Sequence, residues 1–110
     1  DYETIVNDGY QRSHPEKLAA LRRFTLAKEA FEYRNDVATA EEILAEVVQR
    51  DPENLRYQLL WGLMKLKLDD FAGGEAIFRK IVAANDNDLH TKDVASYLVA
   101  RIRADANDED

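Results

Sequence analysis

Few side chains in this sequence are of the types that usually carry out chemistry. There is no cysteine, and the two histidines, His14 and His90, stand far apart in the chain. His14 precedes a proline at the expected start of one helix, and His90 falls at the expected start of another. Each is therefore predicted to be a surface residue rather than a metal ligand or a general base. The lack of cysteine excludes a disulfide scaffold and a thiolate metal site.

Two acidic runs, residues 69–70 and 85–88, are the remaining candidates, for a calcium site. An EF-hand loop that began at Asp86 would need glycine at its sixth position and glutamate at its twelfth. Those positions hold Thr91 and Tyr97. Both runs are more typical of turns and helix caps. We therefore expect no metal, no cofactor and no enzymatic activity in this chain.

The charge balance narrows the class of partner. The chain has 110 residues with 22 Asp and Glu against 15 Lys and Arg, a net charge of -7, which argues against nucleic acid or an anionic membrane surface. Its longest apolar run, 59–68, is interrupted by two lysines and is far shorter than the ~20 residues that span a bilayer. We expect a soluble domain without membrane insertion, and the compartment stays open, with the cytoplasm favoured.

Helices must position whatever site the chain has. Its content of 45% hydrophobic and 34% charged residues, with only four glycines and two prolines, favours an all-α fold. Caps are predicted at Ser13, at Thr39 and at Asp51, which Pro52 follows. The expected helices cover residues 15–34, 40–50 (starting up to two residues earlier), 52–68, 71–84 and 89–103. Residues 1–12 form an N-terminal extension, 13–104 the helical domain, and 105–110 an acidic, disordered tail.

The chain repeats itself with a period of 34 residues. Eight positions are identical when residues 21–54 are aligned with 55–88: Leu21/Leu55, Arg22/Arg56, Leu26/Leu60, Asp36/Asp70, Ala38/Ala72, Glu41/Glu75, Ile43/Ile77 and Val48/Val82. A helix–turn–helix unit with this period is the pattern of a helical solenoid. The fifth helix then falls at the first half of a third unit.

The repeated residues resemble the tetratricopeptide repeat family over about residues 21–104. The resemblance is carried in the first unit by Ala40, Leu44, Val47 and Pro52, and in the second by Gly62, Phe71, Gly74 and Phe78. Asn35 and Asp69 depart from it, because they replace the turn glycine, and so does Lys28, which replaces a small residue. The resemblance implies an α-solenoid of antiparallel helix pairs, about two and a half repeats, with a C-terminal capping helix.

The resemblance also implies that a protein or peptide partner binds in a concave groove lined by the first helix of each pair. Leu59, Leu63 and Leu66 are spaced to form one stripe on such a helix. The opposite side of that helix already serves the core, so the stripe needs a cover. The predicted rim of the groove consists of Arg22, Tyr33, Arg56, Tyr97 and Arg101.

The occupant of the stripe is left open by the sequence. The chain's own residues 1–12 or a second copy would make it structural, whereas an amphipathic helix or extended peptide of another protein would make it a binding hot spot. The predicted function is therefore an adaptor or scaffold domain. The alternatives are a homodimerisation module, or an accessory domain of a larger enzyme or assembly factor.

Overall fold

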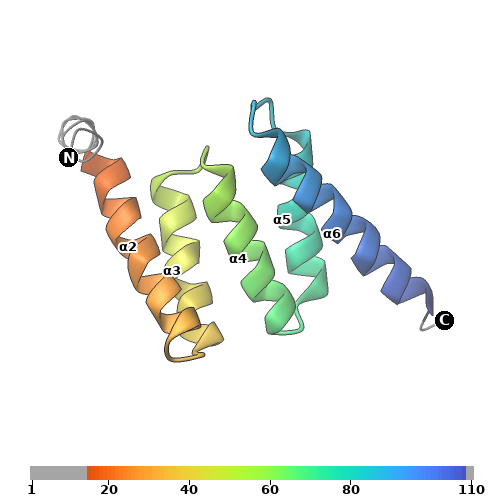
Figure 1. Cartoon of the computed structure of the whole chain (residues 1–110), viewed down its shortest axis with the longest axis horizontal. Coiled ribbons are helices and arrows are strands. Elements are labelled where there is room, and N and C mark those ends of the chain that lie inside the picture. Colours follow the sequence, from red (N-terminus) through yellow and green to blue (C-terminus); the bar gives the residue numbers. More distant parts are fainter. Residues whose placement is uncertain (1–14, 109–110) are drawn as a thin grey trace.

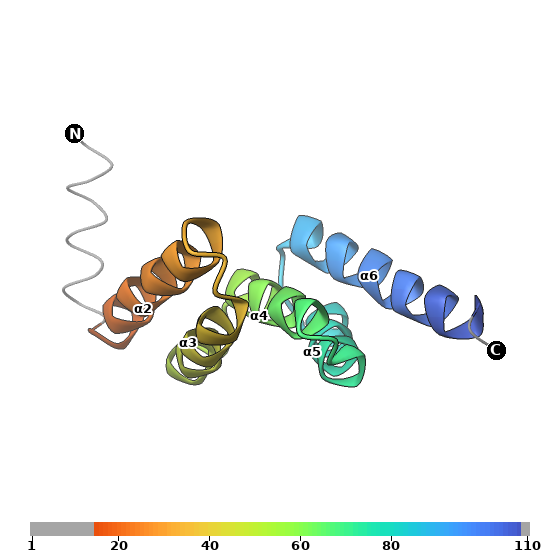
Figure 2. The ribbon, with the colours of Figure 1, turned by 90° about the horizontal axis from the view of Figure 1, so that it is seen from below.

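The computed structural model describes residues 15–108, and the regular structure within them is entirely helical. Five helices follow one another: α2 (Pro15–Glu32), α3 (Val37–Arg50), α4 (Leu55–Lys67), α5 (Phe71–Ala83) and α6 (Leu89–Asp108). Each packs against the next in an antiparallel row, and α4 also contacts α6 (Figure 1). From below, α2, α4 and α6 lie on one side, and α3 and α5 on the other (Figure 2). The prediction of an all-α domain with five helices is confirmed. The predictions for residues 1–12 and the Ser13 cap lie outside the described residues.

The helix α3 begins earlier than a cap at Thr39 would place it. Its N-cap is Asp36, whose carboxylate accepts hydrogen bonds from the backbone N–H and the hydroxyl of Thr39 at 3.1 and 2.7 Å. Thr39 is therefore already inside the helix, and the predicted cap there is wrong. An N-cap side chain accepts from N–H groups two or three residues after it, and with the cap at Asp36 one of these groups belongs to Thr39.

The start of α4 also differs from the prediction, which placed a cap at Asp51. Asp51 instead ends α3, where its backbone N–H donates to the carbonyl of Val47. The actual N-cap is Asn54, whose side chain accepts from the backbone N–H groups of Arg56 and Tyr57 at 3.1 and 3.3 Å. Aspartate and asparagine are both favoured N-cap residues, and Asn54 is the one that directly precedes Leu55, the first residue of α4.

The predicted disordered tail is wrong for residues 105–108, which continue α6. Arg101 and Asp105 pair at 3.8 Å one turn apart, which supports the helix beyond residue 103. Alanines at 104 and 106 are also strong helix formers. Residues 109–110 lie outside the described part. None of the helices within residues 15–108 is both long and apolar enough to cross a membrane.

The turns inside the two hairpins, α2–α3 and α4–α5, have the same form. Asn35 and Asp69, which are 34 residues apart, both have positive φ, 50° and 64°. This left-handed conformation is the one that glycine adopts most readily, and asparagine and aspartate tolerate it better than other residues do. The aspartate that follows caps the next helix in both cases, Asp36 for α3 and Asp70 for α5. The turn therefore keeps its shape without the expected glycine.

The core consists of two main clusters joined at α4. The first contains Ala27, Ala30, Ala40, Leu44 and Met64, from α2, α3 and α4. The second contains Leu55, Ile77, Phe78, Ile81 and Ala95, from α4, α5 and α6. Trp61 and Leu63 of α4 are partly buried against both clusters. The helix α4 is therefore the shared wall of the domain.

The second hairpin is closer packed than the first at one point. A Cβ atom on Gly62 would lie 2.5 Å from a ring carbon of Phe78, a side chain that is fully buried. The equivalent of Gly62 in the first hairpin, 34 residues earlier, is the exposed Lys28. Only the α4–α5 pair therefore depends on a glycine for its approach.

Candidate functional site

The predicted stripe of three leucines on α4 is partly covered by the chain itself. Leu59, Leu63 and Leu66 are each half-buried, and all three pack against the cluster that α4 forms with α5 and α6. A helix apolar nearly all round does need cover, as the sequence indicated, and α5 and α6 supply part of it. The three leucines therefore expose less apolar surface than a fully open stripe would.

The aromatic residues of the predicted rim are open to solvent. Tyr33 at the end of α2 is 82% exposed, and Tyr97 in the middle of α6 is 63% exposed. Arg22 is exposed on α2. Arg22 and Tyr33 therefore belong to α2 and its end and Tyr97 to α6, and none of the three lines the hollow to which Leu66 contributes.

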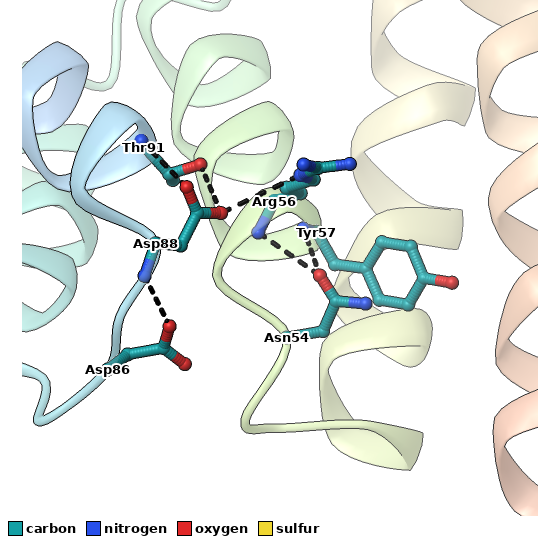
Figure 3. A network of polar contacts seen from close by, with 6 residues as sticks. All are labelled: Asn54, Arg56, Tyr57, Asp86, Asp88 and Thr91. Carbon is teal, nitrogen blue, oxygen red and sulfur yellow. Dashed lines mark hydrogen bonds and ion pairs between the residues drawn. The ribbon is translucent and has the colours of Figure 1, made fainter.

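Arg56, another predicted rim residue, takes part in the network that fixes the start of α6 (Figure 3). Its Nε lies 3.6 Å from Oδ2 of Asp88. Asp88 also accepts from the hydroxyl of Thr91 at 2.7 Å and from its backbone N–H at 3.1 Å. These hydrogen bonds, together with the charge of Arg56, lower the pKa of the Asp88 carboxyl. Arg56 therefore helps to set α6 against α4.

A second polar network joins α3 to α4. The carboxylate of Glu41 accepts from the indole Nε1 of Trp61 at 3.1 Å and lies 2.8 Å from the ammonium of Lys65. Burial raises the pKa of Glu41, but the hydrogen bonds from Lys65 and Trp61 outweigh it and leave that pKa below its ordinary value. The same contact raises the pKa of Lys65. This network is an ion pair between helices, to which the indole of Trp61 adds a hydrogen bond.

Two of the predicted residues, Leu66 and Arg101, meet in one apolar hollow between α4, the start of α5 and the second half of α6. The hollow has a volume of about 400 Å³. Phe71, at its edge, is 53% exposed. We call this site the α4–α6 hollow. Its lining is Leu66, Phe71, Leu98, Arg101, Ile102, Asp105 and Ala106.

The side chains that fill the first helix interface differ from their counterparts in the second, where the hollow lies. Met64 fills the first interface and is fully buried. Its counterpart 34 residues later, Leu98, is only half-buried. Phe31 packs against the first cluster, whereas its counterpart Lys65 directs its ammonium to Glu41 and Asp70. The two interfaces therefore differ at both of these positions of the repeat.

The length of α6 shapes the other side of the hollow. With 20 residues against 13 in α5, α6 extends beyond the helix that supports it (Figure 1). Leu98, Ile102 and Ala106 follow one another at intervals of four along this extension, so they lie on one side of the helix. The sequence prediction placed Ala106 in a disordered tail. Continuing the same spacing by one step would have identified the lining.

A larger hollow, of about 590 Å³, lies between the α3–α4 turn and the end of α5. Its lining mixes apolar side chains with Glu53, Lys80 and Asp86, and it includes none of the eight residues predicted for the groove. Within residues 15–108, no three histidine, aspartate or glutamate side chains are grouped so as to hold a metal ion. The α4–α6 hollow is therefore the best candidate for a functional site.

The chain was compared with known proteins at three levels. No family model matches it, and neither does any curated protein sequence or any solved structure. A functional assignment therefore depends on the geometry of the described residues and on the repeat in the sequence.

Proposed function

We propose that this chain is a tetratricopeptide-like helical repeat domain that binds a segment of another protein. The 34-residue repeat supports this proposal, together with the two matching turns at Asn35 and Asp69. The alternation of helices between two sides of the molecule also supports it, because stacked helix pairs of a solenoid alternate in this way (Figure 2). In this reading α6 is the first helix of a third unit and caps the stack.

The α4–α6 hollow is the observation on which the binding role depends. An apolar concavity with an exposed aromatic at its edge is the kind of surface that receives the anchor residue of a partner. Phe71 presents such an edge, and Leu66, Leu98 and Ile102 supply the apolar wall. The described groups whose pKa is displaced serve caps, ion pairs or the core instead, which favours binding over catalysis.

A peptide-display selection against the whole chain tests this function. Peptides enriched on the wild-type protein are expected to lose at least about fivefold in affinity for Phe71→Gln, because truncating an anchor contact in a binding hollow costs more than about 1 kcal/mol. The matched control is Val82→Gln, which changes an exposed apolar residue of α5 outside the hollow. Circular dichroism verifies that both variants remain helical.

Failure to enrich any peptide would contradict the proposal, and so would peptides that bind both variants equally well. Light scattering on the same samples distinguishes partner binding from homodimerisation. A dimer of the wild type that Phe71→Gln converts to a monomer would show that the hollow serves self-association.

A further inference from the structure

The α4–α6 hollow lies beside a helix end whose charges are arranged unfavourably. The helices α3, α4 and α5 each carry a basic residue in their last turn, whereas α2 and α6 carry none. From Asp105 to Asp110 the sequence has four carboxylates and no lysine or arginine. Because the C-terminal end of a helix has a partial negative charge, cations are favoured there and carboxylates are not. The end of α6 therefore lacks the positive charge that its neighbours have.

The acidic end and the apolar hollow share a residue. Asp105 lines the hollow together with Ile102 and Ala106, so a group bound against those apolar side chains lies next to the carboxylate. The cation paired with Asp105 is Arg101, at 3.8 Å in an exposed contact along the same helix. Pairs of this kind contribute only a few tenths of a kcal/mol, and a cation from another molecule can replace Arg101 easily.

We propose that the α4–α6 hollow receives a basic amphipathic helix of a partner protein. A large apolar side chain of that helix enters the hollow between Phe71 and Ile102, and its lysine or arginine residues lie against the acidic end of α6. This inference rests on the proposed binding function and names the chemistry of the partner. Charge complementarity distinguishes this occupant from a second copy of the chain, whose own net charge is -7.

Three synthetic helical peptides test the inference on the full chain. They share one apolar face with leucines at helical spacing and differ only in the other positions, which are lysine, glutamine or glutamate. Fluorescence anisotropy is expected to rank affinity in the order lysine, glutamine, glutamate, with at least about tenfold between the extremes. The lysine peptide is expected to weaken as salt rises, because exposed charges are screened.

Three substitutions locate the charge preference and the apolar contact on the molecule. Asp105→Asn is expected to reduce the preference for the lysine peptide, whereas Asp93→Asn, which makes the same charge change earlier on α6, leaves it unchanged. Phe71→Gln is expected to weaken all the peptides that bind. A general attraction of a basic peptide to an acidic protein would respond to both aspartate variants equally, and that result would overturn the inference.

The remaining outcomes separate this inference from the proposed function. If the three peptides bind equally and all weaken with Phe71→Gln, the hollow binds partners but the basic chemistry is wrong. If none binds, the inference is overturned, and the display selection still decides the function. If the wild type is a dimer and Phe71→Gln is a monomer, the hollow binds a second copy of the chain, and the inference of a basic partner helix is overturned.

Discussion

The two interfaces on either side of α4 use the same positions of the repeat with different side chains. Where α2 and α3 meet α4, Met64 is fully buried among alanines and Leu44, and Phe31 packs beside it. Where α4 and α5 meet α6, Leu98 and Lys65 stand at the corresponding positions, and a hollow of about 400 Å³ lies beside Leu98. The comparison indicates that one interface is built to be closed and the other has room for a further group.

The largest expected difference concerns the side chain at the centre of each interface. Met64→Ala is expected to lower the free energy of unfolding by about 3.5 kcal/mol, since a fully buried side chain leaves a cavity, and Leu98→Ala by about 1 kcal/mol, since its site is already open. Urea denaturation followed by circular dichroism measures both. Equal losses would mean that the two interfaces are packed alike.

The next prediction tests the close approach inside the hairpins. Gly62→Leu is expected to lower the free energy of unfolding by about 3 kcal/mol, because the new side chain overlaps the buried ring of Phe78. The matched change in the first hairpin, Lys28→Leu, is expected to alter it by less than about 0.5 kcal/mol, because that residue is exposed. Thermal unfolding compares the two variants. A tolerated leucine at 62 would show that the second hairpin has room which the structure does not show.

Smaller losses in the free energy of unfolding are expected when the carboxylate at position 41, or at its counterpart 75, is replaced. Glu41→Gln is expected to cost about 1.5 kcal/mol at neutral pH, because it weakens charged hydrogen bonds from Lys65 and Trp61. Glu75 pairs with Arg79 and Arg103 at longer distances of 3.6 and 3.3 Å. Glu75→Gln is therefore expected to cost about 0.5 kcal/mol.

The stabilisation by Glu41 is also expected to depend on pH. The pKa of Glu41 in the folded protein lies below its ordinary value of 4.5. Its ion pair therefore contributes fully above that value, and the contribution is lost as the pH falls through the lowered pKa. The difference in stability between wild type and Glu41→Gln is expected to shrink over this range in urea titrations at successive pH values. A difference that stayed constant down to the lowest pH would contradict an ionised Glu41 as its source.

The smallest expected effects are stabilising and concern the two turns with positive φ. Asp69→Gly is expected to raise the free energy of unfolding by about 1 kcal/mol and Asn35→Gly by about 0.5 kcal/mol, because glycine relieves the strain and asparagine has less of it than aspartate. Differential scanning calorimetry measures the two increases. A decrease at either position would mean that the side chain stabilises its turn by more than the strain costs.

The sequence predicted the type and order of the helices because their apolar spacing and breaks are strong local signals. It also predicted that the side of α4 opposite the leucine stripe serves the core, and Leu60, Trp61 and Met64 do pack in the first cluster. Cap positions were predicted less well. Thr39 and Asp51 have side chains suited to a cap, but the helices begin at other residues, where Asp36 accepts from the N–H of Thr39 and Asn54 from those of Arg56 and Tyr57.

The candidate site was only partly predictable. The sequence placed Leu66 and Arg101 in the predicted groove, whereas Phe71 was named only as a residue of the repeat. The hollow depends on how far α6 extends past α5 and on how α6 lies against α4. Both are tertiary effects that no local pattern encodes. The acidic composition of residues 105–110 indicated disorder, although α6 continues to Asp108. Composition alone does not detect that Ala106 continues the spacing of Leu98 and Ile102 on one side of the helix.

The position of α4 has a consequence for how the domain unfolds. Because Trp61 and Leu63 are packed against both clusters, neither half of the molecule can lose its packing without disturbing the other. The domain is therefore expected to melt cooperatively in one transition, and cutting the chain between α3 and α4 would not release two autonomous halves. The only tryptophan of the chain stands at this junction, so its fluorescence reports on the integrity of both sides at once.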